Sequence, residues 1–354
     1  MRDKKKILFV GTSIVGGGAE RVFINIINSI DISRFDIEIV LTCQPEKTDL
    51  RTDVPVIYYG VSHMRQGLMK LIAEIRRFRP DYVFTSDGTI AWTLPIVRSI
   101  SHCSFKIVTR VAVTPSEKFA INHKSALQEK LSARFYRKMD MVIAQTQFMK
   151  SDLIRNYHIE DDKISVIRNL IDFKRVDALA MEFEPLEIIP GKYNIVASGA
   201  LYSVKGFDLL IEAVSAIVSK IPGLSLLILG DERYEHGYKS FLNRKISELG
   251  LSNNVRLLGH KVNPYPYYKY ANLFVLSSRK EGFPNVVLES LSLGTPVVCT
   301  DCVDFSGIVD DANGVVVAKN SDRALAEGIL KAATAITKPV KFNYRNFDYN
   351  MLFQ

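Results

Sequence analysis

The stretch EGFPNVVLES, residues 281–290, sets two carboxylates, Glu281 and Glu289, around a glycine, a proline and an apolar run. Proline suits the first turn of a helix, because it lacks the amide hydrogen that would be unpaired there. The sequence therefore predicts that a helix begins at about Phe283 to Pro284. Glu281 then lies in the loop before the helix, and Glu289 lies between one and two turns inside it.

The start of this helix could bind an anion. The backbone N–H groups of Asn285, Val286 and Val287 are expected to be unpaired, and with the helix dipole they form an anion site that needs no side chain. A diphosphate held there would bring sugar hydroxyls to Glu281 and a ribose diol to Glu289, since a carboxylate accepts two hydrogen bonds. On spacing alone, the alternative is that Glu281 is a loop charge and Glu289 belongs to a polar helix face.

A second candidate phosphate site lies in ASGALYSVKGFDLLIEA. A strand is expected to end at Gly199, and Lys205 and Gly206 precede the next helix. A lysine in such a loop can reach a diphosphate as a mobile point charge. The alternative is a solvated surface lysine.

The first glycine cluster, Gly16 to Gly18, follows the first predicted strand and opens a helix near Ala19. It does not fit a dinucleotide fingerprint, because Arg21 stands at the third glycine position. It does not fit a P-loop either, because Gly17 stands at the lysine position. The sequence predicts a tight turn at an uncovered helix end that a substrate can approach at Gly17 and Gly18. A simple strand-to-helix turn is the alternative.

Short β-rich runs alternate with amphipathic helical patterns, which is typical of parallel sheets covered by helices on both faces. The alternation breaks once, in a charged segment that contains proline. We therefore expect an α/β fold of two doubly wound, Rossmann-like domains that face each other across a nucleotide-sized cleft. The expected parts are an N-terminal domain over 1–173, a linker over 174–192, a C-terminal domain over 193–338, and a closing helix over 339–354.

The net charge of +8 and the pI near 9.1 indicate an anionic partner, which could be nucleic acid, a phosphorylated small molecule or an acidic membrane. The basic residues lack the interleaved aromatics of a single-strand platform, so no nucleic acid is expected. No window reaches the roughly 18 to 20 apolar residues of a membrane span. The four cysteines indicate reduced cytosolic thiols, with a redox role for Cys299 and Cys302 as the alternative. The scattered histidines and the lack of a D-x-D triplet predict no metal.

These motifs, in this order, resemble the family 4 glycosyltransferases, which are retaining enzymes of the GT-B fold. The resemblance covers nearly the whole chain, and it fits the subset that builds bacterial surface polysaccharides or lipid-linked oligosaccharides. The motifs that carry it are GGGAERV, VIRNLID, VKGFDLLIEA, LGLSNNVRLLG and LFVLSSRKEGFPNVVLESLSLGTPVV.

The resemblance implies that Glu281 contacts the donor sugar near the reacting centre, that Glu289 holds the ribose, and that Lys205 holds the diphosphate. The backbone around Lys261 and Val262 would hold the base. The other implied donor-binding residues are Gly199, Gly282, Phe283, Pro284, Asn285 and Val286. Gly17 and Gly18 would line the N-terminal side of the cleft, and Arg110 stands where relatives carry a histidine or arginine near the acceptor.

The implied reaction moves a hexose or N-acetylhexosamine from a nucleoside diphosphate, expected to be UDP, to a glycan or a polyprenyl-diphosphate-linked acceptor. It keeps the anomeric configuration and needs no cofactor, metal or side-chain base. One departure is Ala200, where many relatives carry an arginine on the diphosphate. Its loss costs about 1.5 to 3 kcal/mol unless another cation, Arg279 or Arg233, or the helix end replaces it.

Two other functions remain open from the sequence. A non-hydrolysing UDP-sugar epimerase shares this architecture, although no histidine pair for acid and base work is evident. A catalytically silent scaffold protein fits the missing arginine. The basic segments 63–79 and 123–139 are either solvated or rest on anionic lipid at the inner face of the cytoplasmic membrane.

Overall fold

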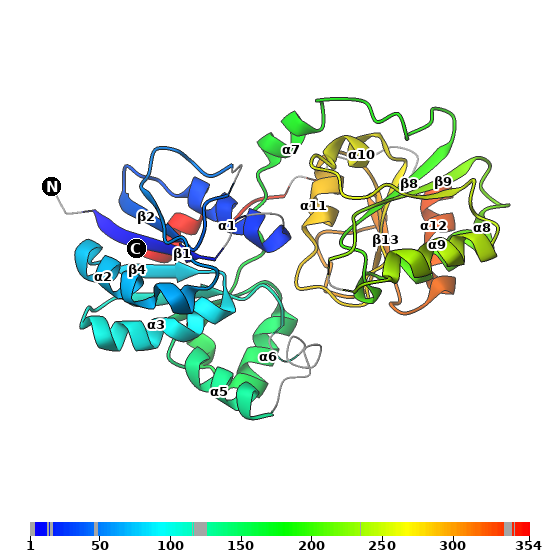
Figure 1. Ribbon diagram of the computed structural model, residues 1–354. Helices are drawn as coiled ribbons and strands as arrows, with labels where there is room; N and C mark the ends of the chain where they lie inside the picture. The colour runs from blue at the N-terminus through cyan, green and yellow to red at the C-terminus, as the bar shows by residue number, and fades with distance from the viewer. Residues whose placement is uncertain are drawn as a thin grey trace. The chain divides into compact units, whose positions relative to one another are not determined.

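A computed structural model describes residues 4–12, 14, 17–45, 49–114, 116, 126–233, 235–335, 342 and 344–354, without the side chains of 126–130. The chain forms two compact units (Figure 1). The first contains Met1–Leu170 and Asn346–Gln354, and the second contains Ile171–Arg345.

The first unit is built on a seven-stranded parallel sheet of order β3-β2-β1-β4-β5-β6-β7. The order reverses between β1 and β4, and ligands bind at the carboxyl ends of strands at such a switch point. The strands are β1 (Lys5–Gly11), β2 (Phe35–Leu41), β3 (Val56–Tyr58), β4 (Tyr82–Thr85), β5 (Lys106–Arg110), β6 (Met141–Ala144) and β7 (Ile164–Val166).

Helices cover both faces of this sheet. One face packs against α1 (Gly18–Ser29), whose buried side carries Val22, Phe23 and Ile26. The 3-10 helix η4 (Tyr349–Phe353) returns to the same face, and Phe353 packs there on Tyr82 with ring centroids 5.4 Å apart. The other face packs against α2 (Leu68–Phe78), α3 (Gly88–Ser101), α5 (Ala126–Tyr136) and α6 (Gln147–Tyr157). Two further 3-10 helices are η1 (Met64–Gly67) and η2 (Asp161–Lys163).

The second unit has a six-stranded parallel sheet of order β10-β9-β8-β11-β12-β13. Its switch point lies between β8 and β11, where the order reverses. The strands are β8 (Tyr193–Ser198), β9 (Leu224–Leu229), β10 (Val255–Leu257), β11 (Leu273–Leu276), β12 (Val297–Thr300) and β13 (Gly314–Val317). The helices are α7 (Phe173–Leu179), η3 (Ser203–Lys205), α8 (Phe207–Ile217), α9 (Tyr238–Glu248), α10 (Tyr265–Tyr270), α11 (Asn285–Ser292) and α12 (Asp322–Ala335).

The predicted fold class, two doubly wound α/β domains, is confirmed. Three strands, β3, β7 and β13, were not predicted. They are three or four residues long, and none of them is buried along its whole length. The compact units divide at Leu170, and the expected linker 174–192 belongs to the second unit, where α7 occupies its first part. Of the expected closing helix over 339–354, the structure describes only η4 as helical, and residues 339–341 and 343 lie outside the described residues.

Candidate functional site

Lys205 and Glu281, both singled out from the sequence, are in direct contact. Lys205 is the last residue of η3, just after β8, and Glu281 lies in the loop between β11 and α11. The Lys205 Nζ lies 2.5 Å from Glu281 Oε1, and the Ser278 hydroxyl donates to the same oxygen at 2.7 Å. The two side chains are only 19% and 14% exposed. Lys205 is therefore not a solvated surface lysine, and Glu281 is not a free loop charge.

The ion pair keeps Lys205 charged. Burial lowers the pKa of Lys205, but the attraction of the Glu281 carboxylate and the hydrogen bond to it raise this pKa, and the net shift is upward. The neighbouring Cys302 is a neutral thiol, because burial and the Glu281 carboxylate raise its pKa to about 12. Burial also raises the pKa of the Cys299 thiol. Since a thiolate is the reactive form, these raised pKa values disfavour a redox role for this pair.

The helix after Glu281 begins slightly later than predicted. Pro284 is the N-cap of α11, with an extended backbone, and Asn285 is the first helical residue. The Val287 N–H donates to the Pro284 carbonyl at 3.1 Å, so the prediction of an unpaired group there is wrong for Val287. The tight turn at the proline uses this donor. Gly282 and Val286 lie half-buried around the helix start, and Phe283 packs into the core.

Glu289 is buried, at 4% exposure, one turn inside α11. The Tyr265 hydroxyl donates to its Oε1 at 3.3 Å. Tyr265 begins α10 directly after the loop with Lys261 and Val262, and Val262 is 89% exposed. The alternative that Glu289 belongs to a solvated polar face is therefore excluded, and the expected base-binding loop is anchored next to the expected ribose carboxylate. The Lys261 side chain pairs with Glu187 at 3.0 Å.

Two glycines let the backbone approach closely around Lys205. A Cβ on Gly199 would lie 3.2 Å from the Lys205 Cε. Gly206 has a φ of +66°, and a Cβ there would lie 2.1 Å from the Ser277 carbonyl oxygen. The loop that carries Lys205 therefore packs backbone against backbone on the end of β11.

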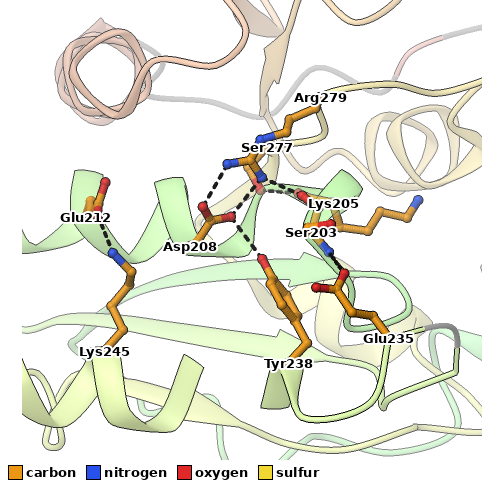
Figure 2. Close-up of polar contacts among 9 residues, drawn as sticks. All are labelled: Ser203, Lys205, Asp208, Glu212, Glu235, Tyr238, Lys245, Ser277 and Arg279. Atoms are coloured by element: carbon orange, nitrogen blue, oxygen red, sulfur yellow. Dashed lines mark hydrogen bonds and ion pairs between the residues drawn. The ribbon is translucent and has the colours of Figure 1, made fainter. Parts of the chain in front are cut away.

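Arg279, one of the two cations suggested in place of the arginine missing at Ala200, is held by a carboxylate. Its guanidinium makes two parallel bonds to Asp208, from Nη1 to Oδ1 at 2.8 Å and from Nη2 to Oδ2 at 2.7 Å (Figure 2). The Tyr238 hydroxyl donates to the same carboxylate at 2.9 Å. Arg233, the other suggested cation, is exposed in the loop after β9.

In the first unit, Gly17 is the N-cap of α1 and Gly18 is its first residue. The Glu20 carboxylate folds back onto this turn, because a Cβ on Gly17 would lie 2.1 Å from Glu20 Oε2. The helix end that the sequence predicted to be uncovered therefore has a carboxylate beside it. Gly16 lies outside the described residues.

Arg110 ends β5 and is 2% exposed. Its Nη2 donates to the Asn169 side-chain oxygen, and burial lowers the pKa of Arg110. Among the residues that the structure describes, Nε and Nη1 have no hydrogen-bond partner. The structure thus brings Arg110 to Asn169 rather than to the surface.

The sequence did not predict a pocket of about 700 Å³ at the carboxyl edge of the first sheet. Thr12, Thr42, Gly60, His63, Arg65 and Asp87 are among its lining residues. The Thr12 hydroxyl donates to Asp87 Oδ2 at 3.1 Å across the β1–β4 switch point. Asp87 also caps α3 through the N–H groups of Thr89 and Ile90. The signal in the sequence is an aspartate directly between a buried strand and a helix.

The basic segment 63–79 is only partly a free surface. Lys70 donates to the Tyr59 carbonyl at 2.8 Å, Arg76 donates to the Ile100 carbonyl at 2.8 Å, and Arg77 pairs with carboxylates. Arg65 and Arg79 are exposed. In segment 123–139, residues 123–125 and the side chains of 126–130 lie outside the described part of the chain.

The described residues contain neither a membrane-spanning helix nor a cluster of metal-binding side chains. None of the helices described is long and apolar enough to cross a membrane. No group of three or more His, Cys, Asp or Glu side chains that could hold a metal occurs in that same part of the chain.

Comparison with known proteins identifies two family domains. Residues 16–175 match the model described as Glycosyltransferase Family 4, and residues 181–346 match the model described as Glycosyl transferases group 1.

Among curated relatives, the uncharacterized glycosyltransferase MJ1059 of Methanocaldococcus jannaschii is 32% identical over 66% of this chain and 58% of its own length. An N-acetylgalactosamine-N,N'-diacetylbacillosaminyl-diphospho-undecaprenol 4-alpha-N-acetylgalactosaminyltransferase of Campylobacter jejuni is 31% identical over 63% of this chain and 59% of its own. The chain thus spans less than two thirds of these two relatives. The lipopolysaccharide core biosynthesis glycosyltransferase LpsE of Rhizobium meliloti is 27% identical over 90% of this chain and 85% of its own.

Solved structures share the fold. Anabaena Alr3699/HepE in complex with UDP-glucose has a TM-score of 0.76, with 21% identity over 93% of this chain and 90% of that one. WaaG, a glycosyltransferase involved in lipopolysaccharide biosynthesis, has a TM-score of 0.69, with 17% identity over 93% and 90%. With two family domains that together span nearly all of its length, and with this fold, the chain belongs to the family 4 glycosyltransferases of the GT-B fold.

Proposed function

We propose that the protein is a retaining glycosyltransferase of polysaccharide biosynthesis. It moves a hexose or N-acetylhexosamine from a UDP-sugar to a glycan or a polyprenyl-diphosphate-linked acceptor. The observation that carries this proposal is the contact of Lys205 with Glu281 at the carboxyl ends of β8 and β11, the switch point of the second sheet. Open parallel sheets bind their ligands at this position.

The names of the relatives and of the solved complexes support the proposed donor and acceptor. The solved complexes of Anabaena Alr3699/HepE hold UDP, UDP-glucose, or UDP and glucose. The Campylobacter relative is named for a diphospho-undecaprenol-linked acceptor, and LpsE is named for the lipopolysaccharide core. These names favour a UDP-linked donor and a glycan or lipid-linked acceptor for this chain.

The proposed role of Lys205 is to stabilise the leaving group. Breaking the glycosyl-phosphate bond puts negative charge on the diphosphate and positive charge on the sugar ring, so preorganised donors at the diphosphate are the largest available contribution to catalysis. Lys205 and the backbone around Asn285 supply them. Glu281, paired with Lys205 before the donor binds, is positioned to bind the sugar when the ammonium turns to the phosphate.

In the proposed reaction the acceptor hydroxyl attacks the anomeric carbon from the face that the diphosphate leaves. The glycosyl-phosphate bond breaks, the new glycosidic bond forms on the same face, and the hydroxyl proton passes to the leaving phosphate oxygen. No side-chain base is needed. Lys205 and the helix end provide the charge, so the reaction as proposed uses neither a cofactor nor a divalent cation.

We assign the remaining binding roles as follows. Glu289 with Tyr265 holds the ribose, and the backbone at Val262, a largely exposed residue, holds the base. In the first unit, the 700 Å³ pocket at the carboxyl edge of the sheet takes the acceptor. Gly17 and Gly18 border the acceptor side, where an anionic group displaces the Glu20 carboxylate.

Release of nucleoside diphosphate tests this function. The purified protein is incubated with UDP-, GDP- and ADP-sugars in the presence of EDTA, for the wild type, Glu281→Gln and the control Glu212→Gln, whose carboxylate pairs with Lys245 of α9. We expect slow release of UDP from one donor by the wild type and the control, and none by Glu281→Gln. No release from any donor, with no thermal stabilisation by any nucleotide, would exclude the proposed enzyme and favour a silent scaffold.

A further inference from the structure

We propose that Arg279 is a positioning residue, which with Asp208 holds the loop 203–206 so that the Lys205 ammonium faces Glu281. The inference rests on the proposed function for Lys205, and it assigns Arg279 a role other than binding the diphosphate. It is carried by the hydrogen bonds of the loop, which the sequence did not predict.

The loop is held from outside through the backbone of all three η3 residues. The segment just after β11 bonds each carbonyl: the Arg279 guanidinium donates to the Ser203 carbonyl, the Arg279 N–H donates to that of Val204 at 2.8 Å, and the Ser277 hydroxyl donates to that of Lys205 at 2.9 Å. The Ser203 N–H donates to the Glu235 carboxylate at 2.8 Å (Figure 2). The loop therefore has little freedom to move without breaking several bonds together.

Arg279 is fixed in turn by Asp208, in the first turn of α8. The two parallel bonds match the planar fork of a guanidinium, which a lysine cannot reproduce. Burial raises the pKa of Asp208, but bonds from Arg279 and Tyr238 lower it, and the net shift is downward. Asp208 thus stays ionised, and α8, α9 and the end of β11 are joined at one carboxylate next to the loop.

A second ion pair between α8 and α9 provides a matched control. Lys245 of α9 pairs with Glu212 of α8, so this ion pair also joins the two helices (Figure 2). Neither of these two side chains is bonded to the loop in Figure 2. A variant of Glu212 therefore reports what the loss of an α8–α9 ion pair does in general, without loosening Lys205.

A double-mutant cycle tests the inference. UDP affinity and the kcat and KM for UDP release are measured for the wild type, Arg279→Ala, Lys205→Ala, the double variant and Glu212→Ala. We expect Arg279→Ala to weaken UDP binding by roughly tenfold, as the loss of one charge-assisted contact does. The double variant should be no weaker than Lys205→Ala within about twofold, because Arg279 acts through Lys205. Glu212→Ala should stay within about twofold of the wild type.

Additive effects would overturn the inference, because they would mean that Arg279 contacts the diphosphate independently of Lys205. Unchanged UDP affinity in Arg279→Ala would overturn it as well.

Hydrogen exchange of residues 199–210 separates this inference from the proposed function. The bonds from Lys205 N–H to Tyr202 O and from Gly206 N–H to Ser203 O protect the loop. Arg279→Ala should speed exchange there, and Glu212→Ala should not. If the wild type binds no UDP but the loop still loosens in Arg279→Ala, the donor proposal fails and the loop contact stands. If exchange is unchanged, the positioning role fails.

Discussion

The Nζ of Lys205 lies 2.5 Å from Oε1 of Glu281, so the residues proposed to bind the two ends of the donor bond are bonded to each other. Both side chains are mostly buried, and removing one partner of such a pair leaves an uncompensated charge. A donor that enters here must offer an anion to Lys205 and hydroxyls to Glu281. A diphosphate sugar carries both groups in one molecule, so it meets both requirements of the proposed donor site.

The pH dependence of stability should reveal the pair. The pKa of Lys205 is raised above its ordinary value of 10.5, so its contribution to the free energy of unfolding is present below that value and is lost as pH rises through the higher folded-state pKa. We expect the difference in Tm between wild type and Lys205→Met to be constant from about pH 7 to 9 and to shrink above about 10.5. The control is Lys245→Met. A difference in Tm that already shrinks below pH 9 would show that burial lowers the pKa of Lys205 more than Glu281 raises it.

Much of the fold could be predicted from the sequence, because buried parallel strands are continuous apolar runs that differ clearly from the helices between them. Residue types also indicated Lys205 and Glu281. Their contact could not be predicted, because it depends on β8 and β11 being neighbours in the sheet. The bond of Arg279 to Asp208 could not be predicted for the same reason.

The burial of Arg110 was hidden from the sequence for a different reason. A charged residue at a strand end is usually exposed, but here the C-terminal segment returns to the same face of the first sheet. Tyr349, which interacts electrostatically with Arg110, belongs to that returning segment.

Restoring an arginine at Ala200 should strengthen nucleotide binding. Ala200 follows Gly199, where an added Cβ would lie 3.2 Å from the Lys205 Cε, so an arginine at position 200 adds a second cation near the proposed diphosphate site. We expect Ala200→Arg to tighten UDP binding by about tenfold, with Ala200→Gln as the control for size without charge. Calorimetry with UDP checks this. Equal affinity in both variants would mean that the site does not extend to this residue.

Arg110 should contribute little to stability, although its charged side chain is buried. Two of its guanidinium nitrogens lack a partner among the described residues, so it is a buried charge with few compensating bonds. We expect Arg110→Met to change the free energy of unfolding by less than about 1 kcal/mol. Asn169→Ala, which removes the bond to Nη2, should cost about 1.5 to 3 kcal/mol. Denaturant unfolding measures both, and a larger loss in Arg110→Met than in Asn169→Ala would contradict this account.

The exposed cations of segment 63–79 should bind anionic membranes, if the lipid-linked acceptor is right. Arg65 and Arg79 are exposed, whereas Arg77 is bonded to Glu38 and Glu74. Each cation near an anionic surface contributes about 1 kcal/mol, so reversing the charges of Arg65 and Arg79 should lower recovery on anionic liposomes more than tenfold. Flotation with and without anionic lipid measures this for the wild type, the Arg65→Glu/Arg79→Glu double variant and Arg77→Gln, which should float like the wild type. Two outcomes would contradict this prediction: equal recovery of all three proteins on anionic lipid, or equal recovery of the wild type on anionic and neutral lipid. Either would mean that these cations are solvated and that the acceptor reaches the protein by another route.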